Sequence, residues 1–200
     1  MDELRLTLVT DRTQTRGREL VSVVGDCLAA GLPAVQVREK DLGAAALALL
    51  CRRIRGLTLD TRALLIVNDR VDVALAVGAD AVQRTSTSLA VEDIRAIADK
   101  RLRIGASVHS LPDALQAELE GADWLVFGPV YDTPSKRMYG PPQGLDKLAR
   151  VAAAVRIPVV AIGGIDASNA GDCVGAGAAG VAVVRAASNA KAVSEALGAR

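Results

Sequence analysis

The chain has few aromatic residues and no excess of charge of either sign. Only 2% of its 200 residues are aromatic, and 24 Lys and Arg are balanced by 23 Asp and Glu, for a formal net charge of +1. Proteins that bind nucleic acids usually carry a basic excess. The charge balance therefore gives no support to a nucleic-acid partner, although it is compatible with a local phosphate site.

The chain also lacks long apolar runs and a disulfide-type cysteine pattern. No apolar run approaches the roughly 18 residues of a membrane span, and the acidic start Met1–Arg5 is unlike a signal peptide. The cysteines Cys27, Cys51 and Cys173 are odd in number and form no C-x-x-C pair. We therefore expect buried thiols in a reducing environment and a cytoplasmic protein with no membrane association.

What the sequence does contain is an alternation of short β-rich runs with Ala- and Leu-rich segments of helical period. The predicted strands are 4–10, 34–38, 64–68, 80–83, 103–108, 124–127, 158–162 and 180–184. The predicted helices are 18–30, 44–55, 71–77, 91–100, 112–120, 145–155, 168–174 and 189–197. Glycines stand where helices should end, at Gly31, Gly78, Gly121 and Gly175.

Strands that alternate with helices imply parallel βαβ units, and eight of them suggest a closed (β/α)₈ TIM barrel. We expect one compact barrel domain over residues 1–200, with one long loop, Gly128 to Gly144, after strand six. Loops of this length in compact domains are often lids or binding loops. The alternative is an open doubly wound sheet, which a G-x-G-x-x-G turn after a strand would favour, and no such turn is present.

In such barrels, functional residues lie at the carboxyl ends of the strands. After strand two, alternation puts Gln36, Arg38 and Lys40 on one side, with Val35 and Val37 facing the helices. Buried charges need partners, and a phosphate or diphosphate would pair with an Arg and a Lys. The alternative is a solvated strand end.

Strand three ends with short oxygen ligands. Asn68 and Asp69 could hold a Mg²⁺ ion that bridges to substrate phosphates, because Mg²⁺ often uses only one or two carboxylates. Asp69 could equally be the N-cap of the next helix. The sequence leaves both interpretations open.

Strand five leads to the only histidine of the chain. Alternation places Gly105, Ser107 and His109 on one side, with Gly105 leaving space below. Histidine is the usual general acid or base near neutral pH, so His109 and Ser107 are the candidate catalytic residues. The alternative role of His109 is to cap the helix that begins at Ser110.

Strands seven and eight carry a phosphate-site pattern. Gly163 and Gly164 follow strand seven, next to Val184 and Arg185 at the end of strand eight. In TIM barrels, backbone N–H groups at this place and a helix N-terminus hold a phosphate dianion. We therefore predict that these four residues bind a phosphate group.

Taken together, these residues resemble the thiamine phosphate synthase/TenI family of small barrels. The resemblance covers nearly the whole chain. It rests on Val9-Thr10-Asp11, Gln36-x-Arg38-x-Lys40, Asn68-Asp69-Arg70, Ser107-Val108-His109-Ser110, Gly128-Pro129-Val130, Thr133-x-Ser135-Lys136, Pro142-Gln143-Gly144 and Ala161-Ile162-Gly163-Gly164-Ile165.

The resemblance implies a role for each matched residue. The synthase joins a thiazole phosphate to a hydroxymethylpyrimidine diphosphate and releases diphosphate with Mg²⁺. In that pattern Asp69 is a magnesium ligand, and Gly164, with Val184 and Arg185, holds the thiazole phosphate. The diphosphate ligands and the lining of the reacting centre would be Gln36, Arg38, Lys40, Asn68, Ser107, Thr133, Ser135 and Lys136.

The sequence departs from the synthases after strand four. The synthases read Asp-Gly-Val-His-x-Gly-x-x-Asp, where the last Asp is the second magnesium ligand. This chain reads Asp80-Ala-Val-Gln-Arg-Thr-Ser-Thr-Ser88, so a hydroxyl replaces that carboxylate. A neutral hydroxyl is a poor Mg²⁺ ligand.

The altered motif favours the TenI branch, whose members isomerise thiazole phosphate to its aromatic tautomer without a metal or other cofactor. His109 matches the histidine that moves the proton there. The alternative is the synthase with Mg²⁺, which the intact Gln36, Arg38 and Lys40 set supports. A non-catalytic sensor of thiazole phosphate is a further alternative. The expected partners are a phosphorylated thiazole, a pyrimidine diphosphate in the synthase case, and a second copy of the chain.

Overall fold

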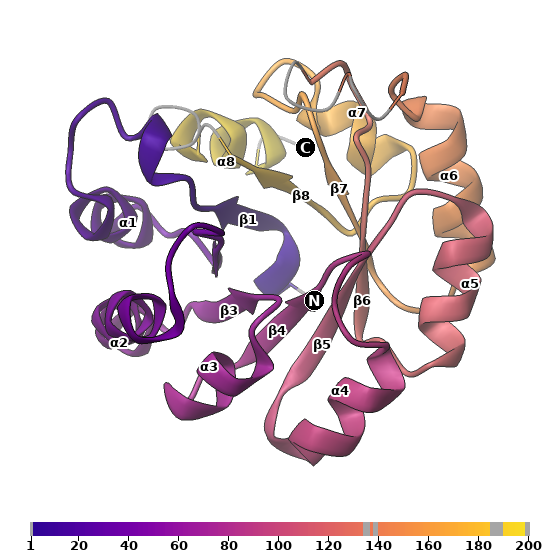
Figure 1. Cartoon of the computed structure of the whole chain (residues 1–200). Helices are drawn as coiled ribbons and strands as arrows, with labels where there is room; N and C mark the ends of the chain where they lie inside the picture. Colours follow the sequence, from indigo (N-terminus) through magenta and orange to yellow (C-terminus); the bar gives the residue numbers. More distant parts are fainter. Residues whose placement is uncertain (1, 134–136, 138–139, 185–189, 199–200) are drawn as a thin grey trace.

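Eight parallel strands close into a barrel in which the order around the ring is the order along the chain. The computed structural model describes residues 2–133, 137, 140–184 and 190–198. Figure 1 shows the helices arranged outside the ring of strands. The predicted TIM barrel is confirmed.

The elements follow the predicted alternation closely. The strands are β1 Leu6–Val9, β2 Ala34–Val37, β3 Leu64–Asn68, β4 Ala81–Arg84, β5 Arg103–Val108, β6 Trp124–Phe127, β7 Val159–Ile162 and β8 Gly180–Val183. The α-helices are α1 Leu20–Ala29, α2 Ala44–Thr61, α3 Val71–Ala76, α4 Val91–Ala98, α5 Leu111–Leu119, α6 Gly144–Ala154, α7 Ala170–Gly175 and α8 Ala190–Gly198. Short 3₁₀ helices are η1 Asp2–Leu4, η2 Arg12–Gln14 and η3 Asp99–Arg101.

The strands are buried on both faces, which is why they read as nearly continuous apolar runs. Val35 and Val37 belong to the large apolar layer between the strands and the helices, as alternation predicts. Ala34 belongs to the separate cluster that fills the barrel interior. The other buried members of that inner cluster are Leu4, Val9, Leu64, Ile66, Ala81, Trp124, Val126, Val160 and Ala182.

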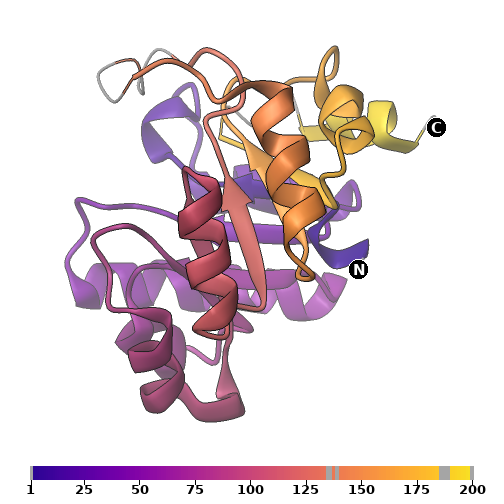
Figure 2. The same ribbon diagram turned by 90° about the vertical axis from the view of Figure 1, so that its right-hand side faces the viewer.

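The long segment after β6 leads from the barrel into α6. In Figure 2, α5 and α6 stand in front of β6, and the strand points to the end of the barrel from which this segment leaves. The segment returns to its own start, because Gln143 N–H donates to the Pro129 carbonyl at 2.8 Å and Gly144 N–H donates to the Val130 carbonyl at 3.0 Å. Residues 134–136, 138 and 139 of the segment lie outside the described residues.

The helix α2 is longer than predicted. The sequence predicts its end at Arg55, but the helix continues through Gly56 to Thr61. Ile54 and Thr58 are both buried on the same face, so tertiary packing outweighs the low helix propensity of this last part.

One predicted glycine cap is wrong. Gly175 is the last residue of α7, and Gly177 adopts the positive φ of 96° instead. The caps at Gly31, Gly78 and Gly121 have the positive φ that the sequence predicts.

The three cysteines are free and buried, as predicted. Among the described residues, no helix is long and apolar enough to cross a membrane. Trp124 lies in the barrel interior, whereas Phe127 lies in the layer beneath the helices, so their closeness in sequence does not make one aromatic cluster.

The space beside Gly105 is not left open below His109, and that expectation was wrong. The indole of Trp124 and the side-chain amide of Gln83 fill it, and a Cβ atom at Gly105 would overlap both. Glycine on β5 therefore allows the one tryptophan of the chain to occupy the barrel interior, under the polar side chains of the carboxyl-terminal end.

At the amino-terminal end of the barrel, two carboxylates make similar contacts with a strand and a helix. Asp80 accepts the backbone N–H of Leu65 at 2.8 Å and pairs with Arg55 of α2 at 2.7 Å. Asp123 accepts the backbone N–H of Ile104 at 2.6 Å and pairs with Arg95 of α4. Each carboxylate thus links a helix to the start of a strand. These stabilising contacts lie at the end of the barrel away from the carboxyl-terminal ends of the strands.

We predict that Gly105→Ala destabilises the protein by about 1–3 kcal/mol, because the added methyl group overpacks a filled interior. Gly56→Ala in α2 is the control, because nothing lies within 4 Å of the position that its added methyl group would take. That control should stabilise the protein by roughly 0.5–1 kcal/mol. Urea denaturation followed by the fluorescence of the single Trp124 measures both, and an unchanged midpoint for Gly105→Ala would contradict the packing described.

Candidate functional site

The inner wall of the barrel becomes polar at the carboxyl-terminal ends of β2 to β5. Gln36 Nε2 donates to Asn68 Oδ1 at 3.0 Å, and Gln83 Nε2 donates to Ser107 Oγ at 3.0 Å. Asn68 and Gln83 are neighbours in the register of β3 and β4. The four side chains therefore form a continuous polar layer across four strands.

Three of the four side chains are almost inaccessible to solvent, and Ser107 is partly buried. Gln36, Asn68 and Gln83 are 5%, 9% and 1% exposed. Among the described residues, Gln83 Oε1 is a buried polar side-chain atom without a hydrogen-bond partner. In the sequence, Gln83 stands out only because the family carries a histidine at this position. Gln83 is two residues after the inward-facing Ala81 in β4, so the alternation of side chains could have placed it inside the barrel.

Two cations stand beside this layer without partners. Arg38 is partly exposed and Lys40 is exposed, both in the segment that follows β2. Within the described part of the chain, neither side chain makes an ion pair or a hydrogen bond. Their charges are therefore available to an anion at the barrel mouth.

Asp69 does not cap the next helix, so that interpretation was wrong. The N-cap residue of α3 is Arg70, and its side chain makes no capping hydrogen bond. Asp69 has a positive φ of 66°, and its carboxylate accepts the hydroxyl of Ser88 from the loop after β4. Ser88 Oγ also accepts the backbone N–H of Thr85 at 2.8 Å.

The structure thus places Ser88 beside Asp69, as the family spacing implies for a second metal ligand. Asp69 and Ser88 offer one carboxylate and one hydroxyl, and no group of three or more His, Cys, Asp or Glu side chains forms a metal site among the described residues. Mg²⁺ commonly uses one or two carboxylates and completes its shell with water and substrate phosphates. The oxygen donors present fit Mg²⁺ only as a weak site that needs the substrate.

His109 lies just beyond the end of β5 and is exposed. Its ring Nδ1–H donates to the Gly128 carbonyl at 2.5 Å, which leaves Nε2 as the nitrogen with the free lone pair. The helix cap is Ser110, whose hydroxyl accepts the Asp113 N–H at 3.2 Å. The interpretation of His109 as a cap was therefore wrong.

The paired glycines after β7 pack against the segment that follows β6. Gly163 and Gly164 have φ angles of 100° and 66°. A Cβ at Gly163 would lie 2.6 Å from Pro129, and one at Gly164 would lie 2.7 Å from Tyr131. Thr133 Oγ1 also faces Gly163, because it would lie 3.2 Å from the same Cβ. Only glycine permits this approach.

Within the described part of the chain, the backbone N–H groups of Gly164 and Ile165 donate to no acceptor. The neighbouring Tyr131 is not a base at neutral pH, because desolvation raises the pKa of its phenol to about 12. The Gly164 and Ile165 N–H groups are thus available as backbone donors on this side of the mouth.

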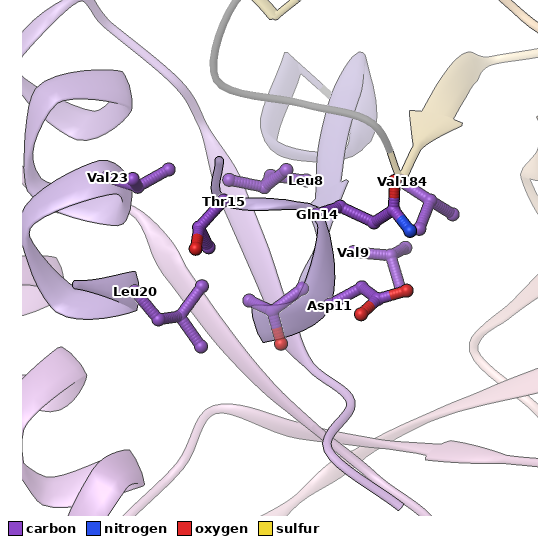
Figure 3. Close-up of a pocket in the computed structure, with 9 residues that line it drawn as sticks. Leu8, Val9, Asp11, Gln14, Thr15, Leu20, Val23 and Val184 are labelled. Carbon is purple, nitrogen blue, oxygen red and sulfur yellow. The ribbon is translucent and has the colours of Figure 1, made fainter. Parts of the chain in front are cut away.

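Several predicted site residues lie outside the described residues: Ser135, Lys136 and Arg185. Val184 is described, and it borders a small pocket of about 20 Å³ beside the end of β1. Figure 3 shows Asp11 and Gln14 around this pocket with Val184. The pocket holds little more than a water molecule, so it is a crevice next to the mouth rather than a substrate site.

Sequence reasoning missed one buried cluster at the mouth. Glu39 is 6% exposed and Thr10 is 1% exposed, and the Thr10 hydroxyl donates to Glu39 Oε1 at 2.7 Å. The alternation of side chains could have indicated it. Glu39 continues the series of Val35 and Val37, which face the helices and are buried, so a buried side chain was to be expected there.

Comparison with known proteins identifies close relatives. The family described as "Thiamine monophosphate synthase" matches residues 6–187. A thiamine-phosphate synthase of Methanoculleus marisnigri is 44% identical over 181 residues, which cover 90% of this chain and 86% of that protein. One from Moorella thermoacetica is 44% identical over 170 residues, or 85% and 81% of the two chains.

A solved structure agrees with these sequence matches. The thiamine phosphate pyrophosphorylase from Pyrococcus furiosus has a TM-score of 0.90 and 36% identity to this chain. The match covers 98% of this chain and 96% of that one.

We predict that neutral His109 is protonated at Nδ1, because the Gly128 carbonyl accepts from that nitrogen. Nitrogen chemical shifts measure the tautomer directly, and the signal needs no assignment because the chain has one histidine. The protein with His109→Gln is the blank. A neutral form protonated at Nε2 would contradict the arrangement.

Proposed function

Because this chain belongs to the thiamine monophosphate synthase/TenI family of thiamine-biosynthesis enzymes, we propose that it is a thiamine phosphate synthase. It joins a thiazole phosphate to a hydroxymethylpyrimidine diphosphate and releases diphosphate. The observation that carries the proposal is a pair of cations, Arg38 and Lys40, that have no partner among the described residues and follow the strand that carries Gln36. A leaving diphosphate needs these charges, whereas a tautomerase does not.

The chemistry asks for positive charge where the diphosphate departs. Cleavage of the bond between the pyrimidine methylene and the diphosphate oxygen leaves a stabilised cation on carbon and negative charge on the leaving group. Arg38 and Lys40 would take up that negative charge. Gln36 and Asn68 fix the polar edge of the mouth by their mutual hydrogen bond. Thr133, with Ser135 and Lys136, would complete the diphosphate site.

The thiazole phosphate binds on the opposite side of the mouth. Gly163 and Gly164 turn the backbone at the end of β7, and the N–H groups of Gly164 and Ile165 are available donors. Val184 follows β8, with Arg185 next in sequence, and phosphate groups in TIM barrels commonly bind at the loops after strands seven and eight. The two substrates thus approach from β2–β3 and from β7–β8, with Ser107 of β5 lining the centre.

Mg²⁺, when bound, would neutralise charge on the diphosphate. Asp69 would hold it, together with substrate oxygens and water, and Ser88 stands where the family carries a second carboxylate. With one carboxylate, the chain binds the metal more weakly than a two-carboxylate site does.

The TenI-like tautomerase, favoured by the sequence of strand four, is the second candidate. Its support is His109, whose Nε2 is free to exchange a proton at the mouth. The names of these relatives, thiamine-phosphate synthases and a pyrophosphorylase, support the synthase better. In the tautomerase no metal or other cofactor takes part.

The test is incubation with thiazole phosphate, with and without pyrimidine diphosphate and Mg²⁺. We expect thiamine phosphate only when all are present, and we expect Arg38→Gln to lower kcat/KM about 10–100-fold, because a charge-assisted contact to the diphosphate is lost. Arg52→Gln, on an exposed part of α2, is the charge-matched control. Aromatised thiazole without coupling, lost in His109→Ala, would instead establish the tautomerase.

We further predict that Ser88→Asp lowers the Mg²⁺ concentration needed for half-maximal coupling, because a second carboxylate then stands beside Asp69. Ser86→Asp adds the same charge to an exposed position of the same loop and should leave the Mg²⁺ dependence nearly unchanged. Titration of the initial rate with Mg²⁺ measures both. Identical titrations for wild type and Ser88→Asp would exclude a metal site at this position.

A further inference from the structure

The segment that carries Arg38 and Lys40 has no regular structure of its own. The strand β2 ends at Val37 and α2 begins at Ala44. A flexible segment would give its cations many positions, and binding an anion would then cost conformational entropy. What holds this segment in place therefore bears on how well it binds a diphosphate.

A buried carboxylate provides the anchor. The Glu39 side chain is only 3% exposed and lies between the two cationic residues in sequence. Its Oε1 accepts the Thr10 hydroxyl at 2.7 Å, and its Oε2 accepts the Arg12 backbone N–H at 3.2 Å and Arg12 Nη1 at 3.4 Å. A buried carboxylate with this many donors is firmly held.

The same network reaches the backbone of Arg38. The Thr10 hydroxyl accepts the Arg38 N–H at 2.9 Å while it donates to Glu39. On the exposed side, Arg12 forms a two-pronged ion pair with Asp41, with 2.7 Å between Nη1 and Oδ1. One network of hydrogen bonds thus joins the segments after β1 and β2, and it fixes the backbone of Arg38.

We propose that Glu39 is a positioning residue for diphosphate binding: through Thr10 and Arg12, its buried carboxylate fixes the segment from which Arg38 and Lys40 project. The inference rests on the proposed function, since it assigns an anchor to the diphosphate site of the synthase. A positioning role explains why Glu39 stands between Arg38 and Lys40, although its negative charge repels the anion that these two cations would bind.

Whether Glu39→Gln strengthens or weakens anion binding distinguishes a positioning role of Glu39 from an effect of its charge alone. Removing a negative charge near an anion site strengthens anion binding by Coulomb's law alone. If Glu39 positions the cations, Glu39→Gln must instead weaken binding, because the neutral amide cannot satisfy all of the donors that face the carboxylate. Asp60→Asn is the control, since it removes the same charge from an exposed side chain of α2 that takes no part in this network.

The experiment is calorimetric titration of the full chain with inorganic diphosphate in the presence of Mg²⁺. We expect Glu39→Gln to weaken binding about tenfold, the size of one lost charge-assisted hydrogen bond. Asp60→Asn should bind diphosphate as the wild type does. In coupling assays, the KM for pyrimidine diphosphate should rise for Glu39→Gln while the KM for thiazole phosphate stays the same.

A second pair of variants guards against misfolding of Glu39→Gln. Thr10→Val keeps the shape of the side chain but removes the hydroxyl that links Arg38 to Glu39, and should weaken diphosphate binding in the same way. Thr10→Ser restores the hydroxyl and should restore binding. Equal affinity for diphosphate in folded wild type, Glu39→Gln and Thr10→Val would overturn the inference alone. A wild type that neither binds diphosphate nor forms thiamine phosphate would overturn the proposed function as well.

Discussion

Closure of the barrel is the constraint on which the other features depend. Because all eight strands are parallel and β8 pairs with β1, their carboxyl ends form one closed rim, where residues from distant parts of the sequence meet. Closure also demands that the interior be filled, since buried voids forfeit packing contacts. The indole of Trp124, admitted by the missing side chain at Gly105, helps to fill it together with the Gln83 side chain, which in turn donates to Ser107.

The two ends of the barrel divide stability from function. At the amino-terminal end, Asp80 and Asp123 are satisfied twice over, by a backbone N–H and by an arginine from a neighbouring helix. At the carboxyl-terminal end, Arg38 and Lys40 have no partners within the described residues. Arg38 and Lys40 therefore offer positive charge near the carboxyl-terminal ends of the strands, where a phosphate-bearing ligand would pair with them.

The mouth is supported by a layer of contacts behind the residues that would touch substrate. Glu39 and Thr10 hold the segment after β2, and the Gly128 carbonyl holds the ring of His109. Gly163 and Gly164 let the segment after β6 lie against the end of β7. These contacts restrict the positions of the segments and side chains at the mouth, as a rigid scaffold does for groups that it positions before a reaction.

The sequence by itself determined the element order, the (β/α)₈ fold and which polar residues stand at the strand ends. These follow from local rules: the period of apolar residues, the glycines after helices and the alternation of side chains along a strand. The same rules named Gln36, Arg38 and Asn68, because a polar residue in an inward-facing position stands out from its neighbours. They were less reliable for the length of α2, where burial of Ile54 and Thr58 outweighs the glycine between them.

Only the tertiary structure decided which side chains are partners. In the folded chain, Trp124 occupies the space beside Gly105, and Ser110 rather than His109 caps α5. The carboxylate of Asp69 accepts a hydrogen bond from Ser88 and does not cap α3. The tertiary structure also buries Glu39 against Thr10, although the two residues are 29 positions apart in the chain. The reason is physical: such contacts depend on how strands are closed into a ring and how loops cross its rim, and no local pattern of residues specifies those distances.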